Sequence, residues 1–246
     1  MTRILPVEIA VQDVAGVRIA LEQGAARVEL CQALGLGGLT PSAGLVEAAV
    51  AVATEASALA FVHVLVRPRG GGFVYDADEL DTMVRDIRTA RALGAHGVVI
   101  GAATDAGTLD LTAISRFVEA ADGLDVTVHR VVDATPDAFE AVRGLAGSGV
   151  RRVLTSGGGA SCRAGLAMLA RMADDAGDGL EIMAGGGVAI EDIAVLAAAG
   201  VDAVHLSARG RALRGGASGP GGGVDGFDET DAATVRAALD AARAAS

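Results

Sequence analysis

The 246-residue sequence predicts an α/β fold in which eight parallel strands alternate with helices and close into one barrel. One turn pattern supports this fold, because a glycine ends an alanine-rich stretch just before a valine-containing run in GAARV, GAHGV, GVRRV and GVDAV. Glycine adopts the left-handed conformation that ends a helix, and β-branched residues then favour a strand. The length and the 51% of hydrophobic residues suit one domain over 1–246.

Short apolar runs mark the expected strands of this TIM barrel. They lie at 5–10, 26–31, 60–66, 97–101, 125–130, 151–155, 180–185 and 202–207. The stretches between them are rich in helix formers, as repeated βα units require. A doubly wound open sheet is the weaker alternative, because no GxGxxG motif follows the first strand.

Two segments follow the last strand. Residues 208–226 are rich in glycine, so we expect a mobile loop. Residues 228–245 begin with acidic side chains and Thr230 and continue with good helix formers, which predicts the helix that closes the barrel.

The charge and the apolar pattern restrict the partners. A net charge of −11 argues against nucleic-acid binding, which needs clustered Lys and Arg. No signal segment and no apolar run of about 18 residues is present, so we expect a soluble, cytoplasmic protein without a membrane partner. Cys31 and Cys162 form no CxxC pair, which argues against a disulfide framework or a structural zinc site. The alanine-rich outer helices leave a homo-oligomer open.

Polar residues inside or at the end of apolar strands are the catalytic candidates, because the site of a TIM barrel lies at the C-terminal ends of its strands. Glu8 and Glu29 occupy buried parallel strands, in which an unpaired carboxylate is costly. His129 ends the fifth strand and Asp133 follows closely. Each carboxylate has a structural alternative, an ion pair with an arginine inside the barrel. A strand histidine such as His63 or His205 can equally be a hydrogen-bonded core residue, whereas Arg130 and Asp133 near His129 favour a functional role for it.

Arginines and glycine-rich turns at the strand ends predict an anion-binding site. Loops seven and eight form the recurrent phosphate site of this fold, and arginine binds carboxylate or phosphate through two hydrogen bonds. The expected anion-binding residues are Arg67, Arg69, Arg130, Ser156, Gly157, Gly185, Gly186, Gly187, His205 and Ser207. The alternative is that the glycines only permit tight turns and that the arginines pair with the barrel carboxylates.

Several motifs resemble those of one known family in order and spacing. They are VELC (28–31), GGLTPS (37–42), RPRGGGFVY (67–75), TVHRVVD (127–133), RVLTSG (152–157) and IMAGGGV (182–188). Over roughly residues 4–210 the sequence resembles the CutC family. The resemblance implies a TIM barrel, in agreement with the repeat pattern, and a copper homeostasis protein that binds Cu(I) through cysteines.

The sequence departs from this family where copper binding is concerned. The cysteine that often ends the family's first strand is matched by Ala10, and Cys31 remains as the metal-ligand candidate. Cu(I) prefers soft ligands, usually at least two. Met183 and His205 are the residues that could complete such a site.

The motifs are otherwise rich in Glu, His, Arg and Gly, which favours an enzyme. We expect a lyase, isomerase or hydrolase for a sugar-like, phosphorylated or carboxylate substrate, with Glu29 or Glu8 as acid/base and His129 as proton carrier or electrophile. Hydride transfer and a redox cofactor are not expected, because no dinucleotide motif is present. A cytoplasmic Cu(I)-binding protein and a non-catalytic sensor of a small ligand are the alternatives.

Overall fold

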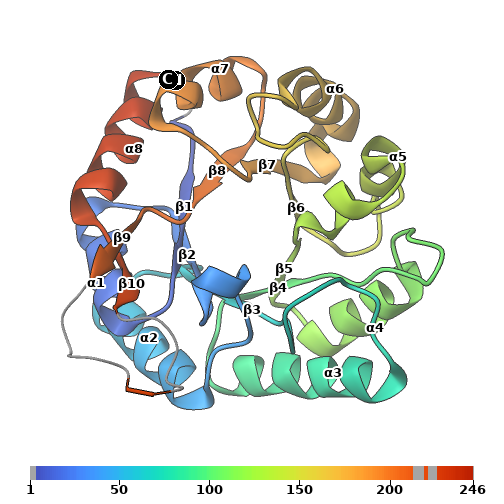
Figure 1. Cartoon of the computed structure of the whole chain (residues 1–246), viewed down its shortest axis with the longest axis horizontal. Helices are drawn as coiled ribbons and strands as arrows, with labels where there is room; N and C mark the ends of the chain where they lie inside the picture. The colour runs from blue at the N-terminus through green and yellow to red at the C-terminus, as the bar shows by residue number, and fades with distance from the viewer. Residues whose placement is uncertain (1–3, 213–218, 221–225, 246) are drawn as a thin grey trace.

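The computed structural model describes residues 4–212, 219–220 and 226–245, and its main sheet is a closed barrel of eight parallel strands (Figure 1). Within the barrel, neighbouring strands pair in chain order, and the eighth strand pairs with the first. The strands are β1 (Val7–Val11), β2 (Arg27–Leu30), β3 (Val62–Leu65), β4 (Gly97–Ile100), β5 (Asp125–Val128), β6 (Arg152–Thr155), β7 (Glu181–Gly185) and β8 (Ala203–Leu206). The predicted TIM barrel is confirmed.

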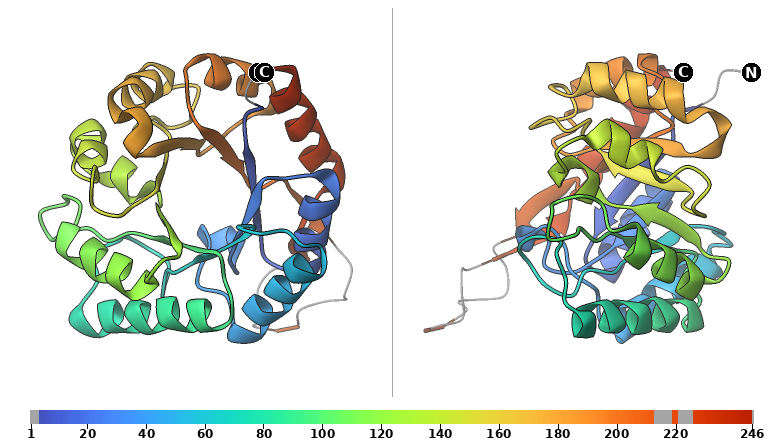
Figure 2. Two further views of the ribbon diagram at one scale, coloured as in Figure 1. Left: turned by 180° about the vertical axis from the view of Figure 1, so that it is seen from behind. Right: turned by 90° about the vertical axis from the view of Figure 1, so that its right-hand side faces the viewer.

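Helices form the outer ring of the barrel, as the views from behind and from the side show (Figure 2). The α-helices are α1 (Val14–Gln23), α2 (Ala43–Glu55), α3 (Ala77–Ala92), α4 (Leu111–Ala121), α5 (Ala138–Arg143), α6 (Leu166–Ala176), α7 (Ile193–Ala198) and α8 (Ala232–Ala244). Short 3-10 helices lie at η1 (Leu34–Leu36), η2 (Arg130–Ala134), η3 (Gly177–Gly179) and η4 (Ile190–Asp192). Within the described ranges, none of these helices is long and apolar enough to cross a membrane.

The four glycines of the repeated turn adopt the predicted conformation. Gly24, Gly94, Gly149 and Gly200 have φ angles of 87°, 85°, 86° and 83°, in the left-handed region. Gly24, for example, ends α1 and donates its backbone N–H to the last turn of that helix. The sequence pattern therefore marks real junctions between helix and strand.

The strands separate an apolar layer from a polar interior. Ile9 and Val28 belong to the main hydrophobic cluster, which includes apolar residues of the surrounding helices. The alternate residues Glu8, Arg27 and Glu29 are also buried, although they are charged. Because successive side chains of a strand point to opposite faces, this alternation gives the barrel a charged interior.

The segment after β8 differs from the prediction. Arg209–Ala212 (β9) and Phe227–Thr230 (β10) form an antiparallel pair, so the expected loop and the start of the expected helix are partly strand. Asp231 then accepts hydrogen bonds from the backbone N–H groups of Ala233 and Thr234, and α8 begins at Ala232. Cross-strand hydrogen bonds stabilise the hairpin, a long-range effect that glycine-rich composition does not reveal. Residues 213–218 and 221–225, part of the predicted mobile loop, lie outside the described residues.

Candidate functional site

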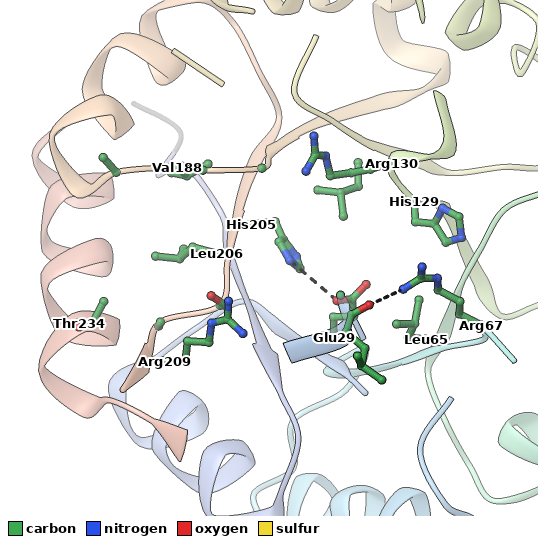
Figure 3. Close-up of a pocket in the computed structure, with 18 of the residues that line it drawn as sticks. Glu29, Leu65, Arg67, His129, Arg130, Val188, His205, Leu206, Arg209 and Thr234 are labelled. Carbon is green, nitrogen blue, oxygen red and sulfur yellow. Dashed lines mark hydrogen bonds and ion pairs between the residues drawn. The ribbon is translucent and has the colours of Figure 1, made fainter. Parts of the chain in front are cut away.

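A cavity of about 670 Å³ opens at the C-terminal ends of the strands (Figure 3). The predicted site residues that line it are Glu29, Arg67, His129, Arg130, Gly186, Gly187, His205 and Ser207. Those that do not line it are Glu8, Cys31, Arg69, Asp133, Ser156, Gly157 and Gly185. The structure therefore brings together candidates from β2, β3, β5, β7 and β8 and their following loops.

A buried ion pair below the cavity fixes one of its histidines. Arg27 Nε donates to Glu8 Oε2 at 2.6 Å, and His205 Nδ1 donates to Glu8 Oε1 at 2.7 Å. Burial alone would raise the pKa of Glu8, but Arg27 and His205 hold it well below its usual range. Glu8 is therefore an ionised structural carboxylate that fixes the position of His205.

Glu29 has the opposite electrostatic environment. Its Oε2 lies 3.8 Å from His205 Nε2, and no arginine forms an ion pair with Glu29 in the described part of the chain. Burial raises the pKa of Glu29 to about 7, against the opposing charge of His205 and with a further contribution from Glu8. Glu29 can therefore both release and accept a proton near neutral pH.

His205 connects the two carboxylates. Burial lowers the pKa of His205, but the hydrogen bond to Glu8 and the charges of Glu29 and Glu8 outweigh that effect, so the pKa is raised. With Nδ1 donating to Glu8, the protonated ring directs its Nε2–H group toward Glu29, as the dashed line in Figure 3 indicates. The arrangement places a cationic donor beside a carboxyl group that titrates near neutral pH.

His129 is a neutral hydrogen-bond donor at the cavity wall. Its Nδ1 accepts from the backbone N–H of Val131 at 3.2 Å, so the proton of the neutral ring resides on Nε2. Burial, with the charge of Arg67, lowers the pKa of His129 to about 3. Nε2 is buried and has no acceptor among the described residues. The ring packs against Phe73 with centroids 4.8 Å apart, and Gly101 leaves the space that the ring occupies.

Arg130 lines the cavity, and its side chain is fixed by hydrogen bonds to residues that lie outside the cavity. Its Nε donates to Asp133 at 2.8 Å, and its Nη2 donates to Ser156 Oγ at 3.2 Å. Asp133 also accepts from Thr155 Oγ1 at 2.5 Å and from the backbone N–H groups of Ser156 and Gly158 at 3.0 Å each. Asp133, predicted as catalytic, thus orients Arg130 and the loop after β6.

The two arginines of the RPR motif do different things. Arg67 donates to the carbonyl oxygens of Leu36, Gly38 and Gly71 at 3.1, 3.0 and 2.7 Å, which connects the loops after β2 and β3. Arg69 points elsewhere and donates to Glu79 Oε2 at 3.1 Å. Arg67 lines the cavity and Arg69 does not, so the two guanidinium groups do not converge on one place.

Sequence reasoning missed two arginines of this region. Arg27 is two residues before Glu29, and this spacing could have placed both on one strand face. Arg209 lines the cavity and donates to Asp228 Oδ2 at 3.0 Å. It lies in β9, inside the segment expected to be a loop, so only the long-range pairing with β10 places it.

The donor set around Cys31 does not fit a Cu(I) site. The Cys31 thiol is fully buried, donates to the carbonyl of Val11 at 3.5 Å, and has a raised pKa because of burial and Glu29. Met183 Sδ accepts from Arg27 Nη2 at 3.2 Å and belongs to a different apolar cluster. In the ranges that the structure describes, no group of three or more His, Cys, Asp or Glu residues could hold a metal ion. The thiolate and second soft ligand that Cu(I) favours are therefore missing here.

The comparison with known proteins agrees with this architecture. The model of the CutC family matches residues 5–210. The chain belongs to the CutC family. A CutC family protein of Agrobacterium fabrum is 42% identical over 201 residues, covering 81% of this chain and 78% of the relative. One from Chromobacterium violaceum is 41% identical over 243 residues, covering 95% and 96%.

Solved structures place the CutC fold among other TIM barrels. A CutC crystal structure from Streptococcus agalactiae, whose name refers to copper homeostasis, has a TM-score of 0.76 at 30% identity and covers 82% of this chain and 97% of that chain. Thiamine phosphate pyrophosphorylase of Pyrococcus furiosus has a TM-score of 0.61 at 15% identity, covering 98% and 96%. At that identity, the second likeness concerns the fold alone.

Proposed function

We propose that this CutC family protein is an enzyme that transfers a proton on a small substrate, with Glu29 as the acid/base. The observation that carries the proposal is the placement of Glu29, a cavity-lining carboxyl with a pKa of about 7, at 3.8 Å from a histidine fixed by Glu8. An acid/base works best when its pKa lies near the working pH.

The neighbouring groups have separate roles in this proposal. The Arg27–Glu8 pair holds His205 with its Nε2 toward Glu29. The charge on His205 stabilises the Glu29 carboxylate and offsets part of the effect of burial on its pKa. His129, neutral and with an unused Nε2–H group, is suited to donate a hydrogen bond to an oxygen of the substrate.

A proton transfer next to a carbonyl uses all three groups. The Glu29 carboxylate takes a proton from the carbon beside the carbonyl, the C–H electron pair forms a C=C bond, and the carbonyl oxygen becomes an oxyanion that accepts a hydrogen bond from His129. If the deprotonated carbon carries a hydroxyl, returning the proton to the former carbonyl carbon while that hydroxyl loses its own proton and becomes the new carbonyl completes an isomerisation. If the next carbon carries a leaving group, re-formation of the carbonyl drives the C=C electron pair toward that carbon and expels the group, which completes an elimination. Glu29 could also deprotonate a water molecule, which leaves hydrolysis as the alternative reaction.

His129 must move slightly for this role. Its Nε2 is buried in the structure, although His129 and the neighbouring Phe73 both line the cavity. In this proposal a rotation of the His129 ring or of Phe73 exposes Nε2–H to an oxygen of the substrate. A buried donor without an acceptor destabilises the protein by about 1–3 kcal/mol, so this hydrogen bond would favour binding.

Proton exchange tests the proposal directly. The wild-type protein is incubated in D2O with a panel of small oxo acids and sugar phosphates, and NMR detects deuterium incorporation or isomer formation. Glu29→Gln should lower the exchange rate about 10²–10⁴-fold, because the amide cannot take the proton. Glu47→Gln, at an exposed position of α2, should leave the rate unchanged. Full exchange by Glu29→Gln would refute the role of Glu29.

Copper homeostasis is the second candidate function, because the name of the Streptococcus agalactiae relative refers to it. An anaerobic Cu(I) titration against a competing chelator, with wild type and Cys31→Ser, separates the two. We expect no tight stoichiometric binding in either protein, since the thiol is buried and its pKa is raised. Tight binding that disappears in Cys31→Ser would favour the copper function. Ligand binding without exchange by any variant would favour a sensor.

A further inference from the structure

We infer that the cavity holds an oxyanion group of its ligand, a phosphate or a carboxylate, between the guanidinium of Arg130 and the backbone N–H groups of Gly186 and Gly187. The inference rests on the proposed function in one respect, because the same cavity is taken to hold the substrate. It identifies the class of substrate as a small anion. The proposed anion site lies where the loop after β5 meets the loop after β7.

Arg130 keeps the N–H groups of Nη1 and part of its charge for the cavity. Its Nε and Nη2 donate to Asp133 and Ser156, whereas Nη1 has no acceptor in the described ranges. The charge of Asp133 is shared among the hydroxyl of Thr155 and the donors of the loop after β6, so it does not neutralise Arg130 alone. The Arg130 side chain is 42% exposed and lines the cavity.

Gly186 is shaped to fit this guanidinium. A Cβ at position 186 would lie 2.6 Å from Cζ and 2.8 Å from Nη1 of Arg130, and its φ of +109° disfavours any residue with a side chain. Arg130 can therefore lie across the loop only if position 186 is glycine. This contact places the guanidinium beside a stretch of open backbone.

The backbone of that stretch provides further donors. Gly186 and Gly187 line the cavity, and over the described residues no acceptor contacts the backbone N–H group of either. Gly187 has a φ of +65°, so both residues adopt conformations that glycine favours. A guanidinium and backbone N–H groups together can bind an oxyanion through charge-assisted hydrogen bonds.

The position relative to the acid/base suits a small anion. Figure 3 shows Arg130, His129, His205 and Glu29 bordering the same space. Arg209, which pairs with Asp228 at 3.0 Å, also lines the cavity. In a chain of net charge −11, positive groups gathered at one opening would attract anions to that opening.

Titration of simple anions tests the inference. Isothermal titration with inorganic phosphate, and separately with acetate, is carried out at constant ionic strength on wild type, Arg130→Gln and Arg130→Lys. Arg130→Gln should weaken the tighter of the two anions about tenfold or more, and Arg130→Lys should weaken it less because the charge remains. The anion that binds more tightly identifies the group as phosphate-like or carboxylate-like.

Matched controls make the result specific. Arg88→Gln, at an exposed position of α3, removes the same charge away from the cavity and should leave affinity unchanged. Gly186→Ala should weaken binding in the same direction as Arg130→Gln, because the Cβ displaces the guanidinium. Wild-type affinity no better than that of Arg130→Gln for both anions, or an equal loss in Arg88→Gln, would overturn the inference.

The anion site and the proton transfer can fail separately. Glu29→Gln should keep or tighten the phosphate or acetate affinity, because Glu29 is not a ligand of the anion and its carboxylate repels an anion in the same cavity. Anion binding that depends on Arg130, without exchange of any substrate proton, would support the anion site and count against the proposed reaction. Proton exchange that depends on Glu29 but not on Arg130 would support the reaction and refute the anion site.

Discussion

The barrel interior contains buried carboxylates at two levels, which differ in how they are paired. The lower half lies toward the N-terminal ends of the strands, and the mouth lies at their C-terminal ends. In the lower half, Glu8 pairs with Arg27 at 2.6 Å and Arg152 pairs with Glu181 at 2.5 Å. At the mouth, Glu29 has no arginine partner among the described residues and faces an open cavity. The cost of burying a carboxylate is therefore offset by an arginine in the lower half of the barrel, and only partly offset, by His205, at the mouth.

The two carboxylates show what this difference means for folding. The pKa of Glu8 is held below its usual range, so its ionised form stabilises the fold, whereas the pKa of Glu29 is raised to about 7, so its ionised form destabilises the fold. Sites that are used for chemistry commonly retain such unfavourable groups. The comparison predicts opposite effects for the same Glu→Gln change at the two levels.

The largest expected effect is at Glu8. Glu8→Gln leaves Arg27 buried without its counter-charge and should lower the free energy of unfolding by about 3–5 kcal/mol, measured by urea denaturation at pH 7.5. Because the folded pKa of Glu8 lies below its unfolded value of 4.5, the wild-type advantage should decline as the pH falls below 4.5. Glu22→Gln, exposed on α1, is the control and should change little. Equal stability of Glu8→Gln and wild type would show that the lower pair is not structural.

A smaller loss is expected where a glycine makes room for His129. In Gly101→Ala the new Cβ would lie 2.5 Å from His129 Cε1 and 2.7 Å from Val131 Cγ1, so stability should fall by about 1–3 kcal/mol. Gly44→Ala in α2 meets no atom within 4 Å and should stabilise the helix by about 0.5–1 kcal/mol. The two changes are compared by thermal unfolding. A neutral Gly101→Ala would mean that the ring of His129 is not fixed by this contact.

Much of this comparison follows from the sequence, because local patterns determine it. The helix-ending glycines and the apolar runs predict the barrel and place Glu29, His129 and His205 inside or at the end of strands. Which carboxylate has an arginine partner depends on the side chains that neighbouring strands bring beside it, and the sequence does not show those neighbours. Asp133 illustrates this, since its oxygens are occupied by a loop whose path the sequence does not reveal. Arg69 and Arg67 are similarly separated by the directions of their side chains.

The pH dependence of activity provides a finer test at the mouth. If Glu29 is the base, kcat/KM should rise with pH through about 7 as Glu29 ionises. In His205→Gln the positive charge that lowers the pKa of Glu29 is absent, so this limb should move to higher pH by a fraction of a unit to about one unit. The measurement is the pH profile of deuterium exchange. An unchanged apparent pKa in the His205→Gln profile would show that His205 does not influence the ionisation of Glu29.

The smallest effect is expected at Cys31. Its thiol is buried beside Leu65 and Val99 and donates to the Val11 carbonyl, a contact that a serine hydroxyl can also make. Cys31→Ser should therefore leave the exchange rate unchanged and lower stability by about 1 kcal/mol. A large loss of exchange activity would give Cys31 a role that its burial argues against.

The stability of Glu29→Gln tests the central claim most directly. Urea denaturation at pH 7.5 should show this variant to be more stable than wild type by roughly 1–3 kcal/mol, because a neutral amide avoids the burial of a carboxylate whose pKa is raised from 4.5 to about 7. The difference should shrink as the pH falls from 7 and vanish below about 4.5, where Glu29 is protonated in both folded and unfolded states. A loss of stability like that of Glu8→Gln would contradict the account and make Glu29 a structural residue.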